Sequence, residues 1–236
     1  MRLARSAALQ RHARGSIPYR PAVAALMSIL CAYTAIGCTT QNSSAPPNRS
    51  KPDISQLTES TILAQSEIKD AQGADFFNGP KLEVNIRDTG SRPSSPPSCN
   101  QLDDGPPNWT QQVSSTWNNG RDLVSLVIGL TTERPDFRSL LNECQRFTIG
   151  KDEYSAQSVT IPGLPDWATS YELTRTYDRE GGPSRTTEVQ GIYSQGYYRG
   201  VLIYGFTQHN NLNDAPSNPE ILADLFNSQA RKLDNT

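Results

Sequence analysis

The chain has 236 residues, which is enough for one domain of ordinary size with terminal tails. It carries 22 basic and 24 acidic side chains, and five of the arginines lie in the first twenty residues, where there is no acid. Residues 38–236 therefore carry 17 basic and 24 acidic side chains, a formal charge of −7. An acidic surface argues against nucleic-acid binding and against adhesion to anionic lipid headgroups.

The N-terminal segment, residues 1–37, has the pattern of a secretory signal peptide. Its arginines precede an uncharged stretch, residues 21–37, whose most apolar part is residues 23–30. A positively charged region followed by a short apolar one is typical of a signal that is cleaved. The stretch is near the lower limit of the ~20 apolar residues that a membrane-spanning helix needs. We therefore expect this segment to be removed during export.

The four residues Ala35-Ile36-Gly37-Cys38 resemble the bacterial lipobox, in which small or aliphatic residues precede a cysteine. In lipobox proteins the thiol receives a diacylglycerol, and the signal peptidase then cuts before the modified cysteine. The resemblance implies that Cys38 is a lipidated N-terminus, held on the outer face of the cell membrane by acyl chains such as palmitate. The other interpretation is that Cys38 is a small apolar residue that ends an apolar segment.

The residues after this cysteine, 39–52, are polar or proline except for one alanine, and they offer nothing from which a core could be built; with Cys38 they make up the segment 38–52. They predict a flexible tether with a reach of roughly 20 Å by random-coil scaling. We expect a single folded domain over residues 53–236.

The remaining cysteines predict one disulfide. Cys31 leaves with the signal and Cys38 takes lipid, so Cys99 and Cys144 are left in an oxidising compartment. A bond between them would contribute ~4 kcal/mol in the chain-entropy model. The alternatives are two free thiols or a metal pair, although with only His209 left a zinc site lacks ligands.

The first half of the domain alternates short helical and strand patterns. Residues 66–71 predict a short helix that Gly73 ends, and residues 81–87 predict a half-buried strand. Residues 89–107 form a long proline-rich loop, which the Cys99 disulfide would hold down. Residues 111–115 and 123–130 predict strands, although the second could be a buried helix. A helix beginning at Pro135 places Cys144 on its buried face.

The second half predicts strands in quick succession, over residues 146–149, 156–161, 171–177, 185–194 and 197–206. Gly181-Gly182 and Gln195-Gly196 mark turns, so the last three strands would form an antiparallel meander. Residues 201–204 are apolar on both faces and should be central. Asn218 and Pro219 would open a terminal helix with an apolar stripe that includes Leu222, Leu225, Phe226, Gln229 and Leu233. This order predicts the α+β class, with a twisted, mostly antiparallel β-sheet flanked by helices.

The order of these motifs resembles the extracellular sensor domain of the mycobacterial kinase PknH and of actinobacterial lipoproteins that carry the same module. The resemblance covers roughly residues 53–234. It is carried by Gly73-Ala74, Pro96-Pro97-Ser98-Cys99, Cys144 before Phe147-Thr148-Ile149, Leu164-Pro165 and Arg199-Gly200-Val201-Leu202. It implies an antiparallel sheet with helices around a cleft. The family often has two disulfides, whereas this chain can form one.

Motifs of catalysis are missing from the sequence: there is no Gly-x-Ser-x-Gly, no phosphate-binding glycine loop and no histidine-rich metal pattern. We interpret Asp103-Asp104 as an exposed turn in preference to a calcium site. His209 is interpreted as a loop residue. Four acidic residues on or near strands could be imagined as glycosidase pairs, but we interpret them as solvated strand edges; they are Glu172, Asp178, Glu180 and Glu188.

Aromatic residues are the positive indication of function. Tyr and Trp combine apolar area with a polar tip, which suits recognition of a lipid, glycan or protein. The alternative is that they are core residues. We expect Trp109 and at least one of Tyr193, Tyr197 and Tyr204, with Arg199 among them, to line the largest cavity. The sequence thus predicts a non-enzymatic binding or sensor-like module without a cofactor, with a cell-envelope hydrolase as the alternative.

Overall fold

The computed structural model describes residues 51–84, 86, 93–103, 105, 108–178, 185–211, 214–216 and 218–236. The predicted signal peptide, Cys38 and the tether up to residue 50 lie outside these residues. By their contacts, residues 48–236 group into one unit. No helix within the described ranges is long and apolar enough to cross a membrane.

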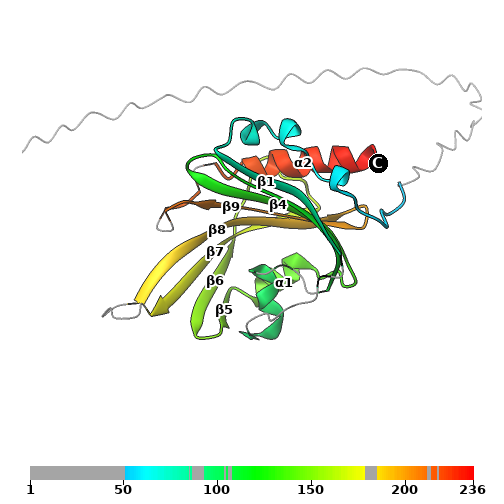
Figure 1. Ribbon diagram of the computed structural model, residues 1–236. Coiled ribbons are helices and arrows are strands. Elements are labelled where there is room, and N and C mark those ends of the chain that lie inside the picture. Colours follow the sequence, from blue (N-terminus) through cyan, green and yellow to red (C-terminus); the bar gives the residue numbers. More distant parts are fainter. Residues whose placement is uncertain are drawn as a thin grey trace, which may run out of the picture. The chain divides into compact units, whose positions relative to one another are not determined.

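One sheet of nine strands makes up most of the described part of the chain (Figure 1). The spatial order is β1-β3-β4-β9-β8-β7-β6-β5-β2, and all neighbours are antiparallel. As its apolar sequence predicted, β9 lies inside the sheet, between β4 and β8. The strands are β1 (Phe76–Val84), β2 (Ser94–Ser95), β3 (Trp109–Asn118), β4 (Asp122–Thr131), β5 (Arg146–Ile149), β6 (Asp152–Ser158), β7 (Ala168–Asp178), β8 (Arg185–Tyr198) and β9 (Val201–His209).

Helices contribute less than the predicted α+β class implies. The described residues contain the α-helices α1 (Phe137–Glu143) and α2 (Ile221–Asp234) and four short 3-10 helices. The latter are η1 (Glu59–Thr61), η2 (Gln65–Glu67), η3 (Lys69–Ala71) and η4 (Pro97–Leu102). The protein is therefore mostly β, and much of the cover on the sheet comes from 3-10 turns and loops.

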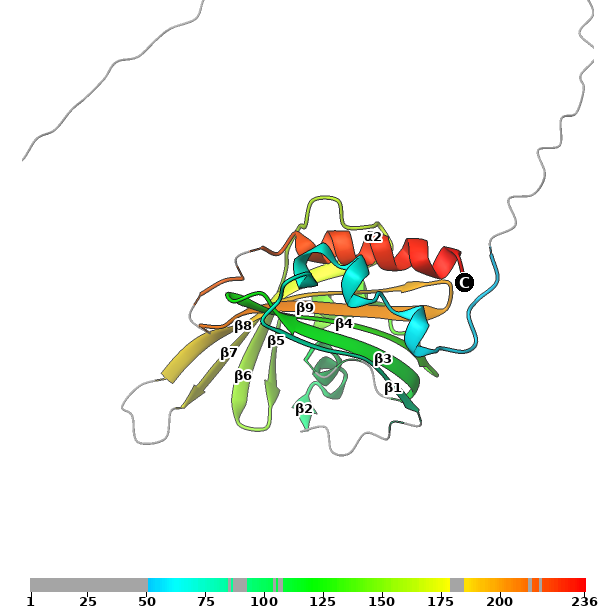
Figure 2. The ribbon, with the colours of Figure 1, turned by 45° about the horizontal axis from the view of Figure 1, so that its top comes forward.

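One face of the sheet is covered by α2 and by the chain that contains η1, η2 and η3, which run beside each other (Figure 2). The predicted stripe of α2 is buried: Leu222, Phe226 and Leu233 have no exposed surface. Gln229 is also fully buried, where its amide accepts from Leu63 N (3.0 Å) and donates to Thr61 O (2.8 Å). These two hydrogen bonds satisfy the buried amide in place of water, and they hold the segment that contains η1 and Leu63 against α2.

The opposite face is covered by α1 and η4, which the predicted Cys99–Cys144 disulfide joins at a Cα–Cα distance of 5.6 Å. Both cysteines are fully buried. Asp136 caps α1 by accepting from Arg138 N (3.1 Å), and Cys144 ends the helix. The disulfide thus closes a second core under the proline-rich segment.

The turn between β8 and β9 lies later than predicted. The structure continues β8 through Gln195 and Gly196 to Tyr198 and turns at Arg199-Gly200, both with positive φ (48° and 76°). Gly196 is needed inside the strand, because a Cβ there would lie 2.4 Å from Trp167 O. Gly196 therefore marks a place of close packing inside the strand, and not a turn.

Other boundaries differ by a few residues. β1 begins at Phe76, ahead of the predicted residue 81. Its pairing with β3 is irregular between Asn78 and Lys81, so the alternation of apolar and polar residues that predicts a strand starts only at residue 81. The predicted end at Arg87 lies outside the described residues. The expected helix over 66–71 consists of the 3-10 turns η2 and η3, and the residue before α2 is Glu220, without a side-chain cap, and not Asn218.

Candidate functional site

The predicted binding tyrosines of the meander are core residues. Tyr193 stacks between Tyr171 and Phe206, at ring-centroid distances of 5.4 and 5.5 Å, and Tyr204 lies 6.0 Å from Tyr193. Tyr193 and Tyr204 are each 7% exposed. The Tyr171 hydroxyl donates to Leu102 O (2.7 Å), and burial raises the pKa of this phenol well above its ordinary value. The four rings thus belong to one core cluster with Leu102 of η4, to which the Tyr171 hydroxyl is bonded.

Trp109 and Tyr197 lie at the border of this core. The Tyr197 ring stacks on Phe137 of α1 at 5.8 Å, and its hydroxyl donates to Glu133 O (3.1 Å). Burial raises the pKa of Tyr197 above its ordinary value. A Cβ placed on Gly129 would lie 2.0 Å from the Trp109 ring. The Tyr197 ring is thus packed against α1, and the Trp109 ring is packed against strand β4.

The expectation that Trp109 and a tyrosine line the largest cavity stays a prediction. The four cavities described here are lined by other residues and not by Trp109, Tyr193, Tyr197 or Tyr204. Above the rings, the disulfide joins η4 to the end of α1, and the Tyr204 hydroxyl donates to Asp103 O (3.2 Å), directly after η4. The disulfide-bonded segment therefore packs directly on the core rings.

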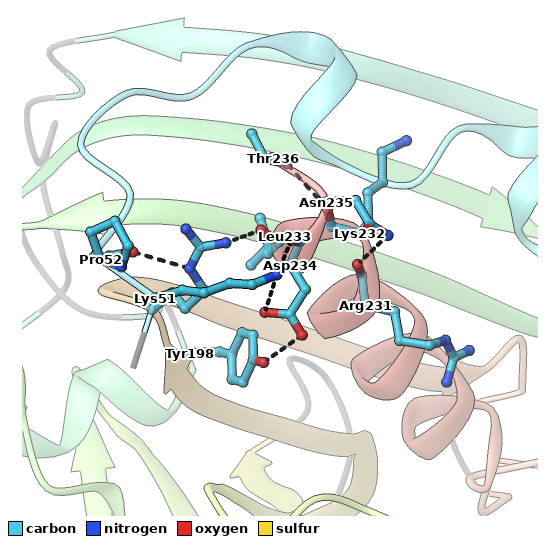
Figure 3. A network of polar contacts seen from close by, with 10 residues as sticks. Lys51, Pro52, Tyr198, Arg231, Lys232, Leu233, Asp234, Asn235 and Thr236 are labelled. Carbon is cyan, nitrogen blue, oxygen red and sulfur yellow. Dashed lines mark hydrogen bonds and ion pairs between the residues drawn. The ribbon is translucent and has the colours of Figure 1, made fainter. Parts of the chain in front are cut away.

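Arg199 is not among these tyrosines. Its Nε donates to Pro52 O (3.0 Å), and its guanidinium also donates to Leu233 O, near the end of α2. Its own carbonyl accepts from Ile54 N (2.9 Å). Figure 3 shows the network around these contacts, in which Asp234 accepts from Lys51 and from the Tyr198 hydroxyl (2.9 Å). Arg199 therefore fastens the first described residues to the C-terminal helix.

A groove that the sequence analysis did not anticipate runs between α2 and the turns η2 and η3. Its volume is about 610 Å³. Its lining includes four buried apolar side chains, at most 6% exposed; they are Leu63, Ile68, Ile221 and Leu225. The α2 residues that line it recur at helical spacing, so one stripe of the helix forms one wall. The other wall comes from residues 63–70.

The charged groups of this groove are mostly acidic. Glu67, Asp70, Glu220 and Asp224 line it, with Lys69 as the cation. Asp70 is held in place because its carboxylate accepts from Trp117 Nε1 (2.9 Å) and from Asn119 Nδ2. Glu220 and Asp224 have no ion-pair partner within the described part of the chain.

A second hollow of about 460 Å³ adjoins this groove toward the end of α2 and shares Leu63, Glu67 and Ser228 with it. Its other charged residues are Arg231 and Lys232. An ion pair between Lys232 and Glu67 joins the two walls where the hollows meet. The charge of the combined groove, which we call the α2 groove, thus changes from acidic to basic along the helix.

The ion pair affects the Glu67 carboxyl. Burial opposes its ionisation, but hydrogen bonds from Lys232 and from Ala64 N (2.7 Å) outweigh that effect and lower its pKa. The carboxylate is therefore charged at neutral pH. The change of charge along α2 is visible in the sequence, at Glu220, Asp224, Arg231 and Lys232. The other wall of the groove could not be predicted, because η2 and η3 contact α2 only in the tertiary structure.

The other residues considered from the sequence show no common site. Glu188 accepts from the Tyr177 hydroxyl (2.6 Å), and Asp178 pairs with Arg185 at 3.9 Å. His209 Nδ1 bonds the backbone of Asn211. Asp104 and Glu180 lie outside the described residues. Among the residues that are described, no group of three or more His, Cys, Asp or Glu side chains could hold a metal ion.

Comparisons with known proteins give one distant likeness. No model of a known protein family matches the chain, and no curated protein matches it. A solved structure of an uncharacterized protein from Mycobacterium smegmatis, the Rv0999 ortholog, is similar with a TM-score of 0.37 and 13% sequence identity. The likeness covers 67% of this chain and 84% of that protein.

Proposed function

We propose that the protein is a cell-envelope lipoprotein, exported by residues 1–37 and anchored to the outer face of the membrane through Cys38. The order of arginines, apolar stretch and lipobox-like residues supports this. The start of the folded part supports it too. Lys51 and Pro52 are fastened by Asp234 and Arg199, so a tether over residues 38–52 would end at a fixed point.

The folded domain, in this proposal, is a non-enzymatic binding or sensor-like module for an envelope ligand or protein partner. The α2 groove is the observation that carries this role. It presents charged and polar groups over apolar side chains that are almost fully buried, and its main hollow of about 610 Å³ lies within the usual range of ligand sites, ~300–1,000 Å³. A lipid, a glycan or a protein segment are the classes of ligand that an envelope offers.

We further propose that this module is of the type found outside the membrane in the kinase PknH and related actinobacterial lipoproteins. The order of elements supports the likeness: a disulfide joins the proline-rich segment to the helix that ends at Cys144, and a hairpin precedes the last helix.

Mass spectrometry of material that co-purifies with the full-length protein from its own membranes tests the binding role. We expect a lipid, glycan or peptide in near-stoichiometric amount. It should be lost from Ser228→Trp, because Ser228 lines both hollows of the α2 groove and an indole there would fill them. Lys151→Trp, at an exposed turn away from the groove, is the matched control. Equal yields from both variants would contradict a role for the groove.

A further inference from the structure

The folded part of the chain begins at one end of the sheet, beside the β8–β9 turn. Arg199 Nε donates to Pro52 O (3.0 Å), and Arg199 O accepts from Ile54 N (2.9 Å). A Cβ on Gly200 would lie 2.9 Å from the Asp53 carboxylate, so the turn and this segment are in close contact. We call residues 51–54, the turn Arg199-Gly200 and residues 231–234 at the end of α2 the anchor end (Figure 3).

Contacts further along the segment keep it in place. Arg134 pairs with Asp53 (3.1 Å), an exposed ion pair that contributes little to stability by itself. Beyond this pair, Leu57 N donates to Gln111 Oε1 of β3 (2.7 Å). The point at which the chain enters the folded domain is therefore fixed relative to the sheet.

The β7–β8 hairpin lies at the opposite end of the sheet (Figures 1 and 2). Strand β8 runs from Arg185, in this hairpin, to Tyr198, next to the anchor end. Its 14 residues span about 43 Å along the strand, at a rise of ~3.3 Å per residue. The predicted tether has a reach of roughly 20 Å. A domain fastened to a membrane by this tether therefore keeps the anchor end close to the lipids, while the hairpin can lie much farther away.

The charge of the domain is distributed unevenly between these two parts. Residues 51–236 carry 16 basic and 24 acidic side chains, a formal charge of −8. The anchor end, with Arg134 beside it, has instead an excess of basic groups, even when the neighbouring acids Glu67 and Glu133 are included. An anionic lipid surface therefore repels the rest of the domain more strongly than the anchor end, within a Debye length of about 8 Å at physiological salt. The basic residues are Lys51, Arg134, Arg199, Arg231 and Lys232, and the acidic residues are Asp53 and Asp234.

We infer that the anchor end is the surface that faces the membrane and that the β7–β8 hairpin points away from it, an inference that rests on the lipid anchor proposed above. The partner of this surface is the lipid bilayer that holds the acyl chains at Cys38. The point of attachment keeps this end near the bilayer, and the acidic remainder of the domain disfavours the reversed orientation. The far end of the sheet is thus presented to other components of the envelope.

Energy transfer from the labelled, lipidated protein to an acceptor lipid, in vesicles of phosphatidylcholine and phosphatidylglycerol, tests the orientation. Cys99 and Cys144 are bonded to each other and buried, so an introduced cysteine can be labelled selectively. We expect at least twofold higher transfer from Thr236→Cys, beside the anchor end, than from Thr187→Cys, at an exposed position of β8 in the hairpin. Equal transfer from both labels, or higher transfer from Thr187→Cys, would overturn the inference.

A pair of charge variants tests the contribution of electrostatics. Arg231→Glu changes a basic group of the anchor end that has no ion-pair partner within the described residues. Lys151→Glu makes the same change of charge at an exposed turn between β5 and β6 and is the matched control. We expect Arg231→Glu to lower the ratio of the two transfer efficiencies on these vesicles but not on phosphatidylcholine alone, and Lys151→Glu not to lower it. The same reduction in both variants would contradict the role of charge in this orientation.

Flotation of the vesicles separates this inference from the lipoprotein proposal. Purified protein that does not float with the vesicles, and that has no lipid on Cys38, would overturn both. Protein that floats but shows equal transfer from the two labels would overturn the orientation alone.

Discussion

The indole ring of Trp109 lies over the α-carbon of Gly129, so closely that a methyl group there would be 2.0 Å from ring carbon Cζ3. A Cβ on Gly105 would lie 3.3 Å from another carbon of the same ring, Cζ2. The ring is therefore held between strand β4 and the proline-rich segment. Trp109 therefore has a structural role, and its ring fits in this place only because Gly129 has no side chain.

This relationship predicts that Gly129→Ala destabilises the protein by about 1–3 kcal/mol, the usual cost of overpacking. The added methyl group must displace the ring, so the tryptophan fluorescence of the folded protein should shift toward that of exposed indole. Thermal or denaturant unfolding measures the first effect. As a control, Trp109→Leu should make Gly129→Ala less costly than it is alone. Equal costs in both backgrounds would show that the ring does not depend on Gly129.

The disulfide gives a second prediction. Cys99 and Cys144 are fully buried and bonded across 45 residues of sequence. Alkylation of the native, non-reduced protein should label neither cysteine. Changing both to serine should lower the free energy of unfolding by ~4 kcal/mol, because the unfolded chain loses its constraint. Quantitative labelling of both cysteines in the native protein would contradict the bond.

The third prediction concerns pH and the α2 groove. The pKa of Glu67 is lower in the folded protein than in the unfolded chain, since the bonds from Lys232 and Ala64 outweigh the effect of burial. Its contribution to stability is therefore present above the unfolded pKa of ~4.3 and is lost as the pH falls through the folded pKa. Because the pair is exposed and screened, we expect Glu67→Gln to cost only about 0.5 kcal/mol at pH 7.

That cost should shrink as the pH falls below ~4.3 and disappear below the folded pKa, where the carboxyl is protonated in the folded and the unfolded protein; it should also shrink in 1 M salt. Urea unfolding of both proteins across this pH range measures it. Glu59→Gln, at an exposed position in η1, is the control. A cost that stays constant from pH 7 to pH 3 would show that Glu67 acts through packing and not through its charge.

Much of the fold could be predicted because local patterns and packing agree. The apolar run of β9 predicted an interior strand, and the spacing of Phe137, Leu140, Leu141 and Cys144 predicted the buried side of α1. Gly196 misled the prediction, because a glycine needed for contact with Trp167 looks the same in sequence as a glycine needed for a turn. The 3-10 turns have no strong periodic signal of their own.

The candidate site was predicted less well, for a physical reason. Aromatic residues suit both a core and a binding surface, and only tertiary packing shows that η4 closes over Tyr193 and Tyr204. The α2 groove depends on residues more than 150 positions apart in the sequence, such as Glu67 and Lys232. No local pattern records that two such segments form opposite walls of one groove.

The lipid anchor makes a fourth prediction. Cys38→Ala removes the thiol that would receive the diacylglycerol, so the variant should accumulate as unprocessed precursor or be released from the membrane. Partition into detergent, together with the size of the protein on a gel, measures both effects. A Cys38→Ala protein that still partitions into detergent with its normal mature mass would show that the lipobox interpretation is wrong.

The N-terminal peptide of the protein purified from its own membranes tests the central claim most directly. Mass spectrometry should find a mature chain that begins at Cys38 and carries a thioether-linked diacylglycerol on the sulfur. Treatment with base should release the ester-linked fatty acids and leave the glycerol attached. A chain that retains residues 1–37, or that has a free thiol at Cys38, would contradict the proposal of an envelope lipoprotein.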